Sequence, residues 1–318
     1  MNPFLDINNL KELVGKSINN PFLLWPDVTK EKAAGFLSKA IKEDSNVGKS
    51  FFFEKDEKIY LYFQIQDLLW DTKHFGYKCS IIKHFYIDEE INFRNVDKIK
   101  KQILPTFENY INDEKIRFLS ADITSQSKNG NYFIQSLGFR FILNWIDGIW
   151  SPKKFEQNDS DFTGRNILPH EVDMFSKIAT FSYYKEGRFY TDKEFDPIKV
   201  YNLYGELIKN SFLSNDIMLS FRDGETPIGI FVCKKIKTYE DFNNLKVAHL
   251  RFLLVNPAYR NKSYGYKIFK ATLAHLKNKC DLITTGLESH NLISINLHYK
   301  MGFKFTYSHN AFHYWNFK

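Results

Sequence analysis

The chain has 318 residues, 43% hydrophobic and 17% aromatic, so it can bury more than one hydrophobic core, and its length favours two domains. No apolar run is long enough to span a membrane, and residues 1–15 lack the basic and apolar blocks of a secretion signal. We therefore expect a cytoplasmic protein without membrane contact. Three scattered cysteines argue against a disulfide framework and against a metal site.

The net charge of +7 and the isoelectric point near 9.0 are compatible with nucleic-acid binding. Lysines and acidic residues are interspersed through most of the chain, however, and no long basic block occurs. A modest positive excess suits a small polyanionic ligand equally well. We predict no nucleic-acid partner.

The first half of the chain mixes helix and strand patterns. Periodic apolar residues predict helices, and β-branched or aromatic runs predict strands. The expected helices are 30–42, 96–108 and 131–137, and the expected strands are 51–55, 59–66 and 116–121. The polar stretch 151–166, with Pro152 and Gly164, is the predicted linker. It separates a domain at 1–155 from a domain at 165–318.

The second half predicts a mixed α/β domain in which strands and helices alternate. We expect helices at 171–179, 199–211, 265–278 and from 291 onward, a loop at 183–192, and strands at 216–223, 228–237, 247–255, 282–287, 304–308 and 312–317. The first two of these strands form a hairpin around Gly224, and the last two form a closing pair.

Residues 247–266 hold the most informative pattern. In the strand, Val247, His249, Arg251, Leu253 and Val255 are expected on one face. A basic loop then leads into a helix, whose first N–H groups are unpaired and carry a partial positive charge. Arginine and lysine side chains beside a glycine complete what we interpret as a phosphate-binding loop.

Within this loop, Arg260-x-x-Ser263-x-Gly265 resembles motif A of the GNAT (GCN5-related) acyl-CoA N-acyltransferase superfamily, with serine in place of the first glycine. Residues 291–303, NLISINLHYKMGF, are similar to motif B, with His298 where the family's tyrosine usually stands. The resemblance implies a GNAT fold and an acyl-CoA co-substrate without a metal. The residues that it assigns to acyl-CoA are Leu253, Leu254, Val255, Arg260, Asn261, Lys262, Ser263, Tyr264, Gly265, Tyr266, Asn291 and Ser294.

The first half repeats part of this pattern. FIQSLGFRF at 133–141 matches LHYKMGFKF at 297–305, which places Gly138 and Gly302 half the chain apart. One interpretation is two GNAT-like halves, the first of which is smaller, degenerate and without a phosphate loop. The alternative is a chance recurrence of a glycine at a helix end.

The resemblance also implies catalytic roles. Backbone N–H groups near Leu254 and Val255 would polarise the thioester carbonyl, and His298, or Tyr299 in its place, would protonate the leaving thiolate. The position at which many members carry a glutamate base holds Arg251. His249 and Glu288 are therefore the candidate bases, unless the amine binds already neutral.

Short segments at Trp70 to Phe75 and at Arg188 to Asp192 resemble elements of TDP-fucosamine-type N-acyltransferases. This resemblance implies a dTDP-linked deoxyamino sugar as acceptor, for surface-polysaccharide synthesis, and acetyl-CoA or a hydroxyacyl-CoA such as hydroxybutyryl-CoA as donor. The residues that it assigns to the sugar side are Trp70, Phe75, Tyr183, Arg188 and Asp192. The alternatives are another amine (a protein, polyamine or aminoglycoside) and a non-catalytic CoA-binding sensor.

Overall fold

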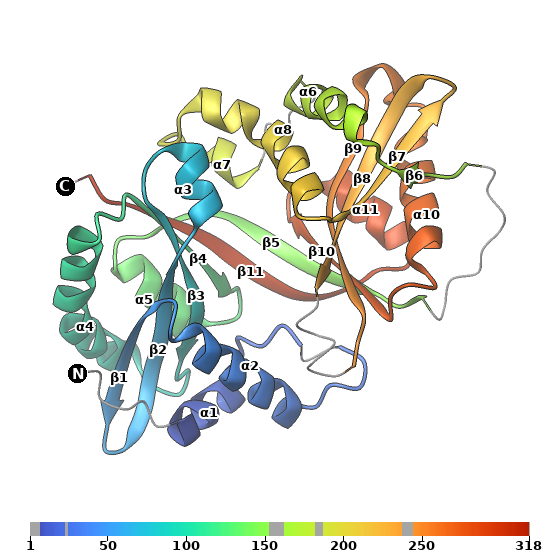
Figure 1. Ribbon diagram of the computed structural model, residues 1–318. Helices are drawn as coiled ribbons and strands as arrows, with labels where there is room; N and C mark the ends of the chain where they lie inside the picture. The colour runs from blue at the N-terminus through green and yellow to red at the C-terminus, as the bar shows by residue number, and fades with distance from the viewer. Residues whose placement is uncertain (1–6, 23–24, 153–161, 182–186, 237–243, 318) are drawn as a thin grey trace. The chain divides into compact units, whose positions relative to one another are not determined.

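The computed structural model describes residues 7–22, 25–152, 162–181, 187–236 and 244–317 (Figure 1). The chain divides into two compact units. Unit 1 comprises Met1–Trp145 and Thr306–Lys318, and unit 2 comprises Ile146–Phe305. The end of the chain thus groups with unit 1, whereas the sequence placed it with the second domain. Each unit consequently receives part of a strand from the other half of the sequence.

Unit 1 is built on strands in the order β1-β2-β3-β4-β11. Strand β3 runs parallel to β4, and the other neighbours are antiparallel. The bounds are β1 Lys49–Lys55, β2 Lys58–Asp67, β3 Cys79–Ile87, β4 Phe118–Thr124 and β11 Lys304–Trp315. The helices are α1 Ile7–Lys16, α2 Lys30–Asp44, α3 Leu69–Phe75, α4 Phe93–Asp113 and α5 Lys128–Ser136. Apolar residues of α4 and α5 pack with those of the strands in one buried core, which fixes both helices on the sheet.

Unit 2 carries strands in the order β5-β10-β9-β8-β7-β6. The bounds are β5 Arg140–Trp150, β6 Arg165–Asn166, β7 Ile217–Asp223, β8 Thr226–Ile236, β9 Val247–Val255 and β10 Leu282–Glu288. The helices are α6 Val172–Phe181, α7 Arg188–Thr191, α8 Pro197–Leu213, α10 Tyr264–Leu276 and α11 Leu292–Lys300. One core joins the strands to α10, and a second core joins them to α6 and α8. Because strand residues alternate between faces, these cores cover opposite faces of the sheet.

The two halves of the chain repeat one order of elements. The series β1-β2-β3-α4-β4-α5-β5 corresponds to β7-β8-β9-α10-β10-α11-β11. In both halves a four-residue parallel register, β3 with β4 and β9 with β10, ends next to a bulge. Gly138 and Gly302 follow corresponding helices, with φ of 95° and 86°. The predicted fold class, a GNAT fold with a second GNAT-like half, is confirmed.

Three local predictions were wrong. The alternation of β9 breaks at Arg251, which the register with β8 skips, so Leu253 and Val255 pack on the same face as Leu250. The expected closing pair is one continuous strand, β11, because its pairing with β4 runs on from His309 to Trp315. The expected loop at 183–192 includes the short helix α7, whereas 183–186 lie outside the described residues.

Among the described helices, none combines the length and the apolar character needed to cross a membrane.

We predict that Gly302→Ala destabilises unit 2. An added Cβ would have room, since its nearest neighbour, Nε1 of Trp150, lies 3.8 Å away. The cost is conformational, because an L-residue at a φ of 86° is strained by about 1–2 kcal/mol. Calorimetry should therefore show a lower melting temperature.

The matched control is Gly35→Ala inside α2, where nothing lies within 4 Å of the added methyl group. Alanine should stabilise that helix by about 1 kcal/mol. If both variants melted like the wild type, the left-handed conformation of residue 302 would contribute nothing to the stability of the protein.

Candidate active site

Strands β9 and β10 are paired over only part of their length. Their parallel register joins Val247–Leu250 to Leu282–Thr285 and stops there. Beyond it, β9 continues to Val255 with β8 as its partner, and β10 continues to Glu288. The edge of β9 over residues 251–255 therefore has no ladder partner on the β10 side. Unpaired backbone N–H groups are strong donors that a ligand can use.

The divergence begins at Arg251. This residue is skipped in the register with β8, so the strand bulges there. Its guanidinium lies 3.2 Å from the Asp216 carboxylate and 3.2 Å from the Ser211 hydroxyl. Unit 1 has the same arrangement of a bulged basic residue paired with a carboxylate, since the Lys83 ammonium lies 2.8 Å from the Asp44 carboxylate. Arg251 thus stands at the family's glutamate position as a paired cation that anchors the bulge, and it cannot accept a proton.

The turn after β9 has the backbone of an anion site. Asn256 caps a short 3-10 turn, and Asn261 and Ser263 follow with φ of 61° and 59°. Ser263 is the N-cap of α10, but its side chain caps no N–H group. It occupies the position of the first glycine in the family's motif. The left-handed backbone conformation at this position explains why glycine is usual there, because glycine adopts it without steric cost. Holding serine there costs about 1–2 kcal/mol.

The first turn of α10 carries positive charge and no acidic residue. Arg260 and Lys262 are exposed, and the Lys262 ammonium lies 5.6 Å from the ring centre of Tyr259. A Cβ on Gly265 would meet Val255 only at 3.8 Å, so no neighbour demands glycine there. Because glycine has no side chain, the backbone N–H groups at the start of the helix stay accessible, and helix starts are where anions bind. We call residues 260–266 the anion loop.

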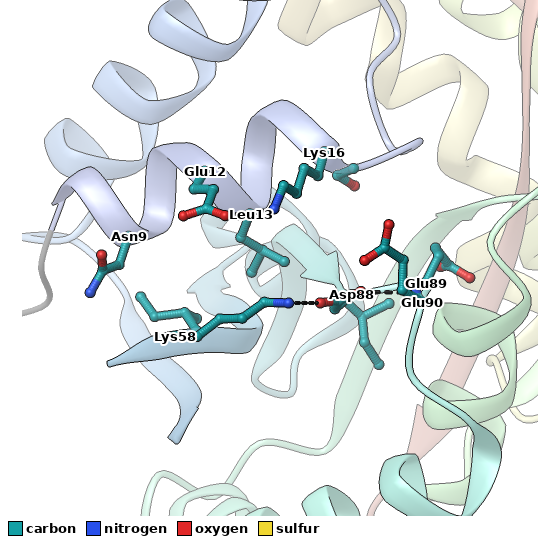
Figure 2. A pocket seen from close by; sticks show the side chains of 11 residues that line it. Asn9, Glu12, Leu13, Lys16, Lys58, Asp88, Glu89 and Glu90 are labelled. Carbon is teal, nitrogen blue, oxygen red and sulfur yellow. Dashed lines mark hydrogen bonds and ion pairs between the residues drawn. The ribbon is translucent and has the colours of Figure 1, made fainter. Parts of the chain in front are cut away.

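The corresponding turn of unit 1, between β3 and α4, has the opposite charge (Figure 2). It contains Asp88, Glu89 and Glu90. Asp88 lies 2.7 Å from the Lys58 ammonium. The Glu89 carboxylate accepts the Asn129 N–H at 3.0 Å, so it already caps the start of α5. A phosphate would be repelled at this turn.

His298 lies inside the core of unit 2, with 5% of its surface exposed, against Phe269 and Phe303. Its Nδ1–H donates to the Ser294 carbonyl at 2.8 Å, and Nε2 lies 3.2 Å from the Thr285 hydroxyl. Burial lowers the pKa of His298 to about 4, so the ring is neutral near pH 7. Both ring nitrogens have partners within unit 2. The acid role stays a prediction, and this geometry gives it no free N–H.

The other motif B residues belong to the same helix, α11, or cap its start. Asn291 is the N-cap of α11, and its side-chain oxygen accepts the Ser294 N–H at 3.1 Å. Tyr299, the alternative acid, has 71% of its surface exposed. The sequence reasoning did not single out Thr285, although it comes from the strand before α11. Only the sheet brings its hydroxyl to His298.

The two candidate bases lie on adjacent strands. His249 Nδ1 is 3.0 Å from the Thr284 hydroxyl, and Glu288 ends β10 on the face of Thr284 by strand alternation. Burial lowers the pKa of His249, and the nearby Asp147 raises it. Sequence reasoning missed Asp147, because it belongs to β5 in the first half of the chain. No local signal marks it.

The residues predicted for the sugar side have diverse surroundings. In unit 1, Phe75 is a core residue with 2% exposure, and the half-buried Trp70 stacks on His74 with ring centres 5.2 Å apart. In unit 2, Arg188 is half-buried over the Phe189 ring, and the buried Asp192 accepts the Glu194 N–H. Tyr183 lies outside the described residues.

Comparison with known proteins identifies this fold. Residues 178–303 match the model of the Acetyltransferase (GNAT) family. The second half of the chain carries a GNAT acetyltransferase domain. The described residues contain no group of three or more His, Cys, Asp or Glu side chains able to hold a metal ion. The protein is an acyl-CoA-dependent acyltransferase that acts on an amine.

Solved structures extend the GNAT likeness over almost the whole chain. A GCN5-related N-acetyltransferase from Sphaerobacter thermophilus is 9% identical, with a TM-score of 0.59 over 98% of this chain and 92% of that one. A tandem GNAT protein from the clavulanic acid biosynthesis pathway is 9% identical, with a TM-score of 0.56 over 97% and 94%.

A third structure, described as a GCN5-related glucosamine N-acetyltransferase region of a fungal multi-domain GH3 β-N-acetylglucosaminidase, is 12% identical. Its TM-score is 0.59 over 97% of this chain and 37% of that one. No curated protein sequence matches this chain. At these identities the structures show a common fold.

We predict that Arg260→Ala weakens CoA binding. A charge-assisted hydrogen bond contributes about 1.5–3 kcal/mol, so the Kd measured by calorimetry should rise by roughly 10–100-fold. Lys277→Ala, at the other end of α10, serves as the control and should leave the Kd unchanged. Equal effects of the two substitutions would contradict a phosphate site at the anion loop.

We also predict that His298 makes the protein sensitive to acid. A ring with a pKa of about 4 when folded and about 6.5 when unfolded binds protons more readily in the unfolded chain. Stability should therefore fall by about 3 kcal/mol as the pH drops from about 6.5 to about 4. His298→Ile, which copies Ile134 of the corresponding helix, should remove this part of the pH dependence in denaturant titrations.

The same variant tests the predicted acid role. If His298 is the acid, His298→Ile should lower kcat by roughly 100-fold or more. Tyr299→Phe, which removes the exposed phenol hydroxyl, tests the alternative acid in the same assay. If the pH dependence of stability were the same in His298→Ile and the wild type, the ring would not be the buried neutral group described above.

Proposed function

We propose that this protein transfers an acyl group from acyl-CoA to the amine of a dTDP-linked deoxyamino sugar in surface-polysaccharide synthesis. The observation that carries the transferase part is the unpaired edge of β9 beside the anion loop in unit 2. It offers backbone donors for a thioester and a positive helix start for the pyrophosphate of the same CoA molecule.

The donor site is proposed to be single. The anion loop of unit 2 is basic, whereas the corresponding turn of unit 1 holds Asp88, Glu89 and Glu90. One acyl-CoA should therefore bind per chain. The N–H groups near Leu254 and Val255 then stabilise the charge on the carbonyl oxygen as the amine attacks. Holding donor and acceptor together removes much of the entropic barrier.

The sugar acceptor is supported by segment resemblance and by chemistry. Trp70 keeps part of its ring exposed while stacked on His74, and an aromatic face can cover the apolar side of a deoxysugar or stack on a base. Arg188 is a half-buried cation suited to a pyrophosphate. One structural neighbour is described as a glucosamine N-acetyltransferase region. The burial of Phe75 favours a core role for that ring.

The experiment that tests this proposal measures the release of free CoA. Each of the two donors, acetyl-CoA and 3-hydroxybutyryl-CoA, is combined with each of a set of acceptors. These are dTDP-linked 3-amino and 4-amino deoxysugars, glucosamine, spermidine, an aminoglycoside and a peptide. We expect fast release with a dTDP-amino sugar, and Arg188→Ala should raise its KM more than it lowers kcat. Lys193→Ala, an exposed cation near α7, is the control.

Transfer to spermidine, an aminoglycoside or the peptide alone would replace the sugar by that amine. CoA binding without transfer to any acceptor would favour the sensor. A calorimetric stoichiometry of two CoA molecules per chain would contradict the single donor site.

A further inference from the structure

A row of polar side chains crosses the sheet of unit 2. Lys234 on β8 is directly opposite His249 on β9, which is directly opposite Thr284 on β10. The His249 ring bonds the Thr284 hydroxyl through Nδ1 at 3.0 Å. If Nδ1–H donates to the hydroxyl oxygen, Nε2 keeps a free lone pair. We call Lys234, His249, Thr284 and Asp147 the polar row.

Asp147 joins this row from the first half of the sequence. It lies on the part of β5 that belongs to unit 2, next to β10 in the sheet. Its neighbour Gly148 faces the other way, because a Cβ built there would lie 3.3 Å from Thr285 and 3.1 Å from the Phe305 ring. Strand alternation therefore directs Asp147 to the face of Thr284 and His249. Its charge acts on the His249 ring.

The polar row ends where the sheet opens. His249 and Thr284 form the pair just before Leu250 and Thr285, the last pair of the β9–β10 register. Arg251, the bulged residue, follows at once and is paired with Asp216. The row lies on the face opposite the core that contains α10. A group bound at the unpaired edge of β9 would thus meet His249 from the side away from α10.

The electrostatics of this position are mixed. Burial lowers the pKa of His249, and the cations Arg251 and Lys234 lower it further. Asp147 acts in the opposite direction. A ring that is neutral near pH 7 can accept a proton, and a neighbouring carboxylate stabilises the imidazolium that results.

We propose that Asp147 is a positioning residue that makes His249 the proton acceptor for the attacking amine. The proposal rests on acyl transfer to an amine but not on the identity of that amine. The amine nitrogen forms the new C–N bond, and the C–S bond breaks with coenzyme A leaving as a thiolate. The proton passes from nitrogen to Nε2 of His249, and Asp147 holds the charged ring.

The test compares Asp147→Asn with the wild type in two measurements. NMR titration of labelled histidines, assigned with His249→Gln, needs no substrate and should show a lower pKa for His249 once the negative charge is gone. In the kinetic measurement, with whichever amine the enzyme accepts, the acidic limb of kcat/KM should move to lower pH. The plateau should fall by roughly tenfold or more.

Asp147→Glu should restore both properties. Asp281→Asn, at the exposed residue before β10, is the matched control and should change neither. An unchanged pKa of His249 in Asp147→Asn would overturn the proposal. So would full activity in His249→Gln with loss of activity in Glu288→Gln. Failure of dTDP-amino sugars as acceptors would count against the proposed function alone, because the NMR titration does not depend on it.

Discussion

The candidate active site depends on the end of pairing between β9 and β10. Four residues of each strand are joined, and then the bulge at Arg251 breaks the alternation. A continuous ladder would consume the backbone donors that a thioester carbonyl needs, and it would leave no opening beside the anion loop. The ion pair of Arg251 with Asp216, the residue before β7, stabilises the bulge. One paired cation therefore occupies the position at which the family resemblance places a glutamate base.

The two halves share one order of elements but differ in the charge of the corresponding turn. Both have the short parallel register and a basic bulged residue paired with a carboxylate. In unit 1 the corresponding turn is acidic, and its Glu89 carboxylate accepts an N–H group at the start of α5. It also has Ile134 where unit 2 has His298. Both halves keep an N-cap at the start of the helix α5 or α11 and a left-handed glycine after it, whereas the turn before α4 is acidic and the turn before α10 is basic.

The path of the chain makes unit 2 dependent on the first half of the sequence. The end of β5 carries Asp147 next to β10, and Trp150 donates its indole N–H to the Met301 carbonyl at 2.8 Å, beyond the end of α11. A fragment of residues 165–318 would lack both groups. The sheet of unit 2 would then expose an edge at β10, and the polar row would lose its carboxylate.

Sequence alone determined the elements whose signals are local. The strand 247–255, the helix that follows the anion loop and the glycine-ended helices are each specified by periodicity and by conformations that few residues tolerate. The resemblance of two motifs to those of the GNAT superfamily added the fold, which the structure confirms, and the acyl-CoA site, which stays a prediction. Tertiary structure decided the rest. A bulge reverses strand faces without changing composition, so the orientation of Leu253 was mispredicted. The partners of His298 and the place of Asp147 depend on which strands become neighbours, and strand order is set by long-range pairing that no short segment encodes.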